Sequence, residues 1–159
     1  NMIVRNDDLA GEIENITKDI FSNMIEIDLT VIPQERYDLE KAESNISSML
    51  GLGGEIKGSL DLHFPKNVAV FVTSQFLGME IEELDDDVRD AIGEVANMVA
   101  GGIKTYFASC NIRTELAIPN TIVGTGYKTH GLAGAERVCV AFSCVQGLFV
   151  AEMKYVRNA

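Results

Sequence analysis

The sequence predicts an α+β fold in which long helices pack on one face of an antiparallel sheet. Two segments, 7–24 and 85–108, carry apolar residues at helical spacing. Short β-rich segments follow each of them, separated by Gly-containing turns. The order helix, strands, helix, helix, strands is typical of this class. Each half has a long helix followed by strands, which leaves open a diverged internal duplication.

The chain is the size of one domain. It has 159 residues, of which 47% are hydrophobic, enough to form a substantial core. It contains no low-complexity segment and no Pro/Ser-rich linker. We therefore expect a single domain over residues 1–159.

In the first half, the predicted helix 7–24 exposes polar residues beside an apolar stripe and should cover the sheet. Three predicted strands follow, at residues 25–32, 44–52 and 55–64. Gly53-Gly54 lies between the last two strands and indicates a hairpin turn.

In the second half, Pro65 opens a helix that should end at Gly78, because proline suits a first helical turn and glycine a helix end. The longest helix is entered through Asp85-Asp86-Asp87, whose carboxylates can cap free amides and favour the helix dipole. Four strands are predicted after it, at residues 112–118, 121–124, 137–144 and 148–156, the last two joined by a hairpin at Gln146-Gly147.

Three glycines interrupt the longest helix: Gly93, Gly101 and Gly102. Each costs about 1 kcal/mol relative to alanine in a helix interior. Their presence indicates close approach of another backbone or of a partner surface.

Charge and cysteine content restrict the possible partners and location. The net charge of −11 argues against binding to nucleic acid or to an anionic membrane surface. The sequence has no long apolar run and no basic stretch leading into an apolar core, so we expect a soluble, cytoplasmic protein. The cysteines, Cys110, Cys139 and Cys144, are odd in number and lack CxxC spacing, which predicts reduced thiols without zinc.

A polar stripe on the longest helix offers the most informative candidate site. Since successive helical residues rotate by about 100°, Glu94 lies about 40° and Asn97 about −20° from Asp90. The three side chains should therefore project together. A carboxylate and an amide without a nearby nucleophile suit a helix that reaches into the active site of another protein.

The sequence around this stripe resembles the CheX, CheC and FliY phosphatases of bacterial chemotaxis, and CheX most of all. Their pattern is Asp or Ser, three residues, Glu, two residues, Asn, then about 21 to 22 residues and Pro. This chain supplies Asp90, Glu94, Asn97 and, after 21 intervening residues, Pro119. The flanking residues 91–101 are similar too, as are Gly54-Glu-Ile-Lys-Gly58-Ser-Leu-Asp-Leu and Leu77-Gly78-Met79.

The resemblance implies hydrolysis of the aspartyl phosphate of a CheY-like response regulator. Asn97 would orient the attacking water, and Glu94 would dock on the lysine of the receiver domain. Asp90 and Pro119 would support the motif. The enzyme would need no cofactor of its own, because the receiver brings Mg²⁺. The resemblance further implies a homodimer, which the sequence itself only permits.

The first helix contains a similar triplet, Asp8, Glu12 and Asn15, and CheC-type relatives carry two copies of the motif. Here Pro33 follows Asn15 after only 17 residues, and the flanks lack the small residues found around Asn97. We expect a degenerate second site at Glu12 and Asn15 that serves as a solvent-facing stripe.

Other functions stay open beside the phosphatase. A non-catalytic adaptor could bind receiver domains or flagellar-switch components through the same helix. The acidic run 80–94 could attract Mg²⁺ or Ca²⁺, but it lacks the spacing of a calcium loop, so we expect no metal site. A serine or cysteine hydrolase is disfavoured, because the chain has only His63 and His130 and no Gly-x-Ser-x-Gly, so a nucleophile has no evident base partner. His63 suits a structural role in a strand.

Overall fold

A sheet of seven antiparallel strands carries all three helices of the described chain. The computed structural model describes residues 4–38, 44–129 and 131–157. The strands are β1 (Thr30–Ile32), β2 (Ile46–Gly54), β3 (Ile56–Phe64), β4 (Thr114–Leu116), β5 (Asn120–Val123), β6 (Glu136–Cys144) and β7 (Gly147–Arg157). Their order is β1-β6-β7-β3-β2-β4, with β5 paired to β2 as well. The helices are α1 (Asn6–Ile20), α2 (Lys66–Leu77) and α3 (Asp86–Ser109).

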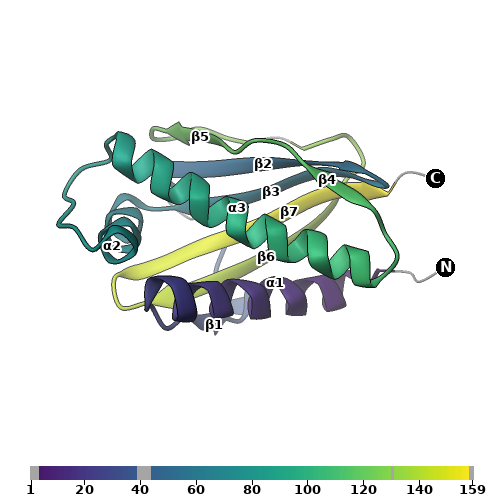
Figure 1. The fold of residues 1–159 in the computed structure, drawn as a ribbon, viewed down its shortest axis with the longest axis horizontal. Helices are drawn as coiled ribbons and strands as arrows, with labels where there is room; N and C mark the ends of the chain where they lie inside the picture. Colours follow the sequence, from purple (N-terminus) through teal and green to yellow (C-terminus); the bar gives the residue numbers. More distant parts are fainter. Residues whose placement is uncertain (1–3, 39–43, 130, 158–159) are drawn as a thin grey trace.

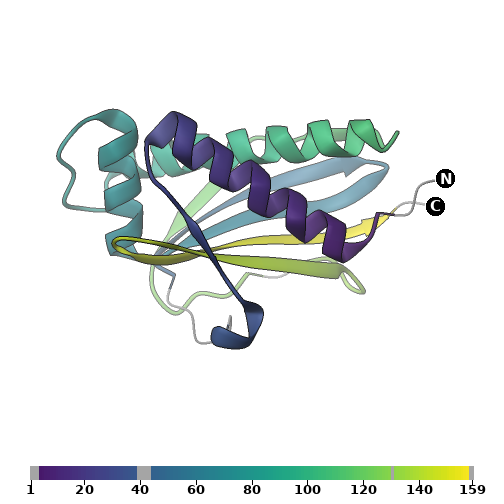
Figure 2. The same ribbon diagram turned by 90° about the horizontal axis from the view of Figure 1, so that it is seen from below.

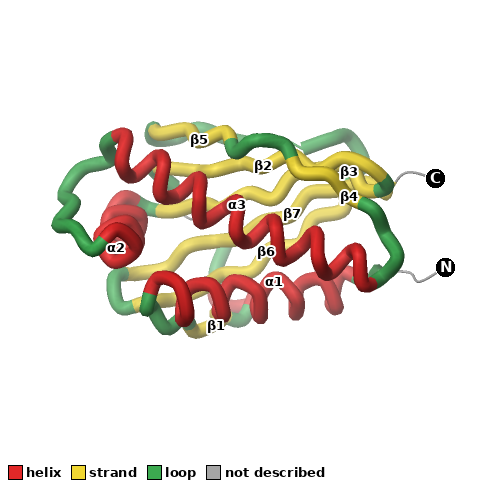
Figure 3. The backbone as a smooth tube through the Cα atoms, in the orientation of Figure 1, coloured by secondary structure: helices red, strands yellow, loops and turns green. Residues whose placement is uncertain are grey.

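The helices form a layer on one face of the sheet. α1 and α3 run side by side over the strands, and α2 lies across one end (Figure 1; Figure 2). Figure 3 shows the same separation of helices from strands. This arrangement confirms the predicted α+β fold with helices on one face. In the described part of the chain, no helix is long and apolar enough to cross a membrane.

The core lies between the two layers. Alternate residues of each strand point toward the helices, and on β3 these include Leu60, Leu62 and Phe64, all fully buried. Phe149 of β7 stacks on three aromatic rings, with centroids 4.6 Å from Phe64, 5.0 Å from Phe21 and 5.2 Å from Phe142. This aromatic cluster joins the central strands to the end of the first helical segment.

Most of the predicted element boundaries are confirmed. Asp85 caps α3, since its carboxylate accepts a hydrogen bond from the Val88 amide at 3.1 Å. Gly78 ends α2 with a φ of 64°, a conformation that favours glycine. Gly54 has a φ of 93° at the β2–β3 turn, so the predicted hairpin forms there.

Three predicted boundaries in the chain are wrong. The strand expected over 112–118 is reduced to β4, because the pairing with β2 covers only Thr114–Leu116. The strand expected over 25–32 is reduced to β1. The π-helical turn η1 (Phe21–Ile25) takes Ile25 into the helical segment, Glu26 turns the chain with a φ of 62°, and residues 27–29 lie outside the sheet. The last hairpin turns at Val145-Gln146 rather than at Gln146-Gly147, since Cys144 pairs directly with Gly147. The charged stretch 34–43 begins with a 3-10 turn, η2 (Gln34–Arg36), and residues 39–43 lie outside the described residues.

Gly102 sets the distance between α1 and α3. A Cβ atom there would lie 2.5 Å from Cγ2 of Ile16 on α1, well inside van der Waals contact. Gly101 differs, because a Cβ atom at that position would meet nothing within 4 Å. A close approach is thus found at Gly102, but it comes from the Ile16 side chain of α1 rather than from a backbone or a partner. At Gly93 a Cβ atom would make only ordinary contacts, and Gly101 faces open space.

This contrast predicts opposite effects of one substitution at adjacent positions. Gly102→Ala should lower the free energy of unfolding by about 1–3 kcal/mol, because Ile16 or the α1 backbone must move. Gly101→Ala should raise it by about 0.5–1 kcal/mol through helix propensity alone. Urea unfolding of both variants measures this difference, and equal effects would show that α1 does not restrain position 102.

Candidate active site

The polar stripe of α3 points to solvent, as the helical rotation predicts. Asp90, Glu94 and Asn97 are all exposed. The opposite side of the helix is buried against the sheet and the other helices through Val88, Ile92, Val95, Val99 and Ile103. Because that apolar side fixes the rotation of α3 about its axis, the stripe cannot turn inward without losing the core contacts.

Glu94 and Asn97 are free to meet a partner. Neither side chain makes a hydrogen bond or ion pair with another residue in the described part of the chain. Gly101 lies one turn beyond Asn97 and, at about 20° from Asp90, falls within the stripe. Since nothing stands within 4 Å of a Cβ atom built at Gly101, the surface beside Asn97 is open.

Pro119 lies against the side of α3 near the stripe. A Cβ atom built at Gly93 would lie 3.8 Å from the Pro119 Cβ and 3.5 Å from Oγ1 of Thr121. Thr121 is in turn 2.9 Å from Ser48, Oγ1 to Oγ, on β2. α3 therefore rests on the edge of the sheet at Gly93, and Pro119 is part of that support, although a Cβ at position 93 would make only ordinary contacts.

The second triplet, on α1, is more enclosed than the first. Asn15 is exposed, but Glu12 is half-buried. Burial raises the pKa of Tyr106 on α3, and Cys110 and the carboxylates of Asp8 and Glu12 raise it further. These two acids therefore lie near the α3 phenol. The structure does not bring Glu12 and Asn15 into the α3 stripe.

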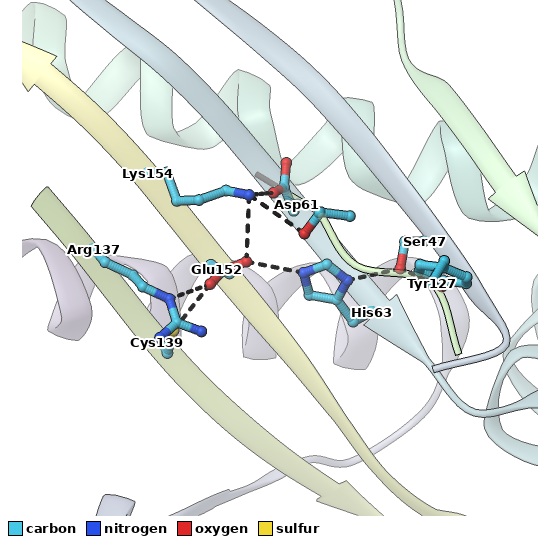
Figure 4. Close-up of polar contacts among 9 residues, drawn as sticks. Ser47, Asp61, His63, Tyr127, Arg137, Cys139, Glu152 and Lys154 are labelled. Carbon is cyan, nitrogen blue, oxygen red and sulfur yellow. Dashed lines mark hydrogen bonds and ion pairs between the residues drawn. The ribbon is translucent and has the colours of Figure 1, made fainter. Parts of the chain in front are cut away.

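A buried polar network occupies the other face of the sheet, and the sequence did not predict it (Figure 4). Asp61 and His63 alternate on β3, and Glu152 and Lys154 alternate on β7. The register pairs Asp61 with Glu152, so the four side chains gather on one face. The signal for it was the period of two in these charged residues, on strands that lie far apart in the chain.

Glu152 is the centre of this network. It is 4% exposed; its Oε1 accepts from His63 Nε2 at 3.1 Å and its Oε2 accepts from Arg137 Nε. Burial raises the pKa of Glu152, but the hydrogen bonds from His63 and Arg137 and their charges outweigh this and lower it to about 2. Lys154 Nζ lies 2.9 Å from Asp61 Oδ2, which supplies the second ion pair.

The loop after β5 covers this network. Ser47 Oγ lies 2.7 Å from His63 Nδ1 and 2.6 Å from the Tyr127 hydroxyl, while Lys154 Nζ donates to Thr129 Oγ1 at 3.4 Å. The order Ser47, His63, Glu152 resembles a hydrolase triad. However, Ser47 is fully buried and is closed off by Tyr127, so no substrate can reach its hydroxyl. The arrangement anchors the loop to the sheet.

The same cluster brings three potential metal ligands together. Ligand atoms of Asp61, His63 and Glu152 lie within 4.8 Å of one another. The ammonium of Lys154 already sits between the two carboxylates, 2.9 Å from Asp61 and 3.8 Å from Glu152. Together with Arg137 it balances both negative charges, and a divalent ion would be repelled by these cations. The donor set does not fit a metal.

Comparison with known proteins assigns the family. The family model described as chemotaxis phosphatase CheX matches residues 46–143, more than half of the chain. The chain belongs to the CheX family. The matched segment includes Asp90, Glu94, Asn97 and Pro119, whereas Glu12 and Asn15 lie outside it.

Similar proteins support both the family and the fold. The CheY-P phosphatase CheX of Thermotoga maritima is 31% identical over 85 residues, which are 53% of this chain and 55% of that protein. The match thus spans about half of that CheX. The crystal structure of CheX from Vibrio vulnificus is 21% identical, with a TM-score of 0.84, and the match covers 97% of this chain and 100% of that one. A CheX–CheY–BeF3–Mg²⁺ complex from Borrelia burgdorferi is 21% identical, with a TM-score of 0.73, and covers 93% and 97%.

These findings confirm the predicted resemblance to CheX and the α+β fold. They leave the individual roles of Glu94, Asn97, Asp90 and Pro119 as predictions. The geometry adds that Glu94 and Asn97 share one exposed face of a helix that this CheX-family chain holds rigidly. The buried network, by contrast, has no exposed reactive group in the described residues.

The depressed pKa of Glu152 predicts how stability depends on pH. Because the folded-state pKa is about 2 and the ordinary value is 4.5, the stabilisation is complete above about pH 4.5 and is lost as pH falls toward 2. It corresponds to about 3 kcal/mol. Unfolding free energies measured from pH 7 to 2 should fall across this window in the wild type.

Glu152→Gln should flatten this part of the profile and lower stability at pH 7, because Arg137 and Lys154 lose their buried carboxylate. Glu115→Gln on β4 is the matched control, since Glu115 is exposed. If the two variants gave the same profile, Glu152 would not be the stabilising acid.

Proposed function

We propose that this chain is a phosphatase that hydrolyses the aspartyl phosphate of a CheY-like receiver domain. One observation carries the proposal: in a CheX-family chain, Glu94 and Asn97 lie side by side on an exposed helix face without partners in the described residues. The similarity to the CheY-P phosphatase CheX of Thermotoga maritima supports the reaction. The Borrelia burgdorferi complex supports a CheY-type partner.

Asn97 acts on the attacking water. Its carboxamide has an oxygen that accepts and an NH₂ that donates, so it can hold a water molecule in line with the P–O bond. The water oxygen forms a bond to phosphorus while the bond to the aspartate oxygen breaks, and a water proton passes to the phosphate or to solvent. Phosphoryl transfer has a loose transition state, so positioning suffices and no strong base is required.

Glu94 holds the two proteins in register. Its exposed carboxylate pairs with the active-site lysine of the receiver, as a charge-assisted hydrogen bond of about 1.5–3 kcal/mol. Asp90 and Pro119 support the helix and its edge. Mg²⁺ belongs to the receiver, so this chain contributes charge and geometry but no cofactor.

We propose one domain over residues 1–159, a homodimer and a cytoplasmic location. The second triplet is proposed to be inactive, because Glu12 is half-buried. An adaptor that only binds receiver domains or flagellar-switch components is the alternative, and it predicts complex formation without acceleration of phosphate release.

Asn97→Ala should lower kcat for dephosphorylation of a cognate phosphorylated receiver at least tenfold, since water is no longer aligned. KM and the melting temperature should change little, because the side chain is exposed and unpartnered in the described chain. Stopped-flow phosphate release measures both constants. Asn15→Ala on α1 is the control and should keep the wild-type rate; a wild-type kcat in Asn97→Ala would falsify the mechanism.

Glu94→Gln should raise KM about tenfold or more through loss of the charge-assisted bond and should weaken the salt dependence of KM. Glu82→Gln, which removes an equal charge from an exposed loop, should leave KM near the wild-type value. A KM that responds equally to both substitutions would mean that only overall charge matters.

A further inference from the structure

A β-bulge interrupts the edge of the sheet beside α3. Leu52 of β2 pairs with Leu116, and Met49 pairs with Asn120. Two residues of β2, Leu50 and Gly51, therefore lie opposite the three residues 117–119. One extra residue has been inserted into the outer strand, and such bulges are frequent at sheet edges and beside active sites, where they redirect a side chain.

Ile118 is the extra residue. Ala117 keeps the β4 pairing, since its amide donates to the Gly51 carbonyl at 2.9 Å. Pro119 has no amide to donate, as suits a bulge, and packs toward Gly93 of α3. Ile118 between them is left 88% exposed, the highest value among the exposed large hydrophobic residues of the described chain.

The direction of the outer strand puts Ile118 on the side of Pro119 that is toward Asn97. Figure 1 shows that the chain returns along α3 in the opposite direction, from β4 to β5. Pro119 lies level with Gly93 of α3. Asn97 is about 6 Å beyond Gly93 toward the C-terminus of the helix. Because the outer strand runs in the opposite direction, Ile118, about 3.3 Å before Pro119, lies on the side toward Asn97. Asn97 is also on the side of the stripe that faces Pro119. Around the helix axis Asn97 is only about 40° from Gly93, which packs against Pro119, whereas Glu94 is about 100° from Gly93.

We propose that Ile118 is a positioning residue that makes the apolar contact with the docked receiver domain and thereby contributes to the choice of receiver. This inference rests on the proposed function. The partner surface that Ile118 contacts is the part of the receiver domain around its acyl phosphate. The contact requires an apolar side chain of the receiver opposite Ile118.

Two physical arguments favour this role. The single charge-assisted bond of Glu94 must offset the entropy lost on association, so Glu94 and Asn97 alone would hold a partner weakly. An apolar side chain at the centre of an interface adds affinity and excludes water from neighbouring polar contacts. Ile118 stands beside that stripe, whereas Val145, which is 82% exposed, lies in the β6–β7 hairpin at the end of the molecule near α2.

The test compares Ile118→Ala and Ile118→Asp with Val145→Ala and Val145→Asp in dephosphorylation assays over a range of receiver concentrations. We expect KM to rise about tenfold in Ile118→Ala and more in Ile118→Asp, with kcat within about twofold of wild type. Ile118→Leu should restore KM. Melting temperatures of all variants should match the wild type, because both positions are exposed.

An unchanged KM in Ile118→Asp overturns the inference, as does an equal rise in Val145→Asp. A change in self-association, measured by sedimentation, without a change in KM also overturns it. Asn97→Ala is assayed in parallel to separate the two proposals. A normal kcat in Asn97→Ala refutes the proposed reaction. A low kcat in Asn97→Ala together with a normal KM in the Ile118 variants refutes only the role of Ile118.

Discussion

The burial of one side of α3 is the constraint on which the rest of the structure depends. Val88, Ile92 and Val95 are fully buried, and they fix the rotation of the helix so that Glu94 and Asn97 emerge together into solvent. The Asp85 cap and the close approach of Ile16 to Gly102 secure the ends of this arrangement. A catalytic strategy based on positioning requires such rigidity, because it has no strong base to compensate for a misplaced water.

The two faces of the sheet carry different kinds of polar residue. On the helix side the polar stripe is exposed and unpartnered within the described chain. Water hydrates these side chains, so they carry no desolvation penalty and can bind a partner. On the far side Asp61, Glu152 and Lys154 are buried. Lys154 forms an ion pair with Asp61, Glu152 accepts hydrogen bonds from His63 and Arg137, and these contacts join β3, β6 and β7 beneath the loop. Removing one member leaves an uncompensated buried charge, so this network serves structure rather than chemistry.

Local patterns predicted what depends on one segment. The period of α3, its acidic cap and its stripe are local, and each was confirmed as geometry. Helix was predicted through residue 24, but the π-helical form of its last turn was not; in that turn Phe21 is buried and stacks on Phe149, a residue far along the chain. The network was missed because it requires the β3–β7 register between strands far apart in sequence. The bulge at Ile118 was missed for a similar reason, since a one-residue offset appears only when both outer strands are aligned to β2.

The most direct test is a structure of this chain bound to a receiver domain loaded with beryllium fluoride and Mg²⁺. The account predicts that α3 enters the receiver's active site, with the Asn97 carboxamide about 2.7–3.2 Å from a water in line with the beryllium centre and Glu94 on the receiver lysine. A complex formed through another face, with the α3 stripe left in solvent, would contradict it.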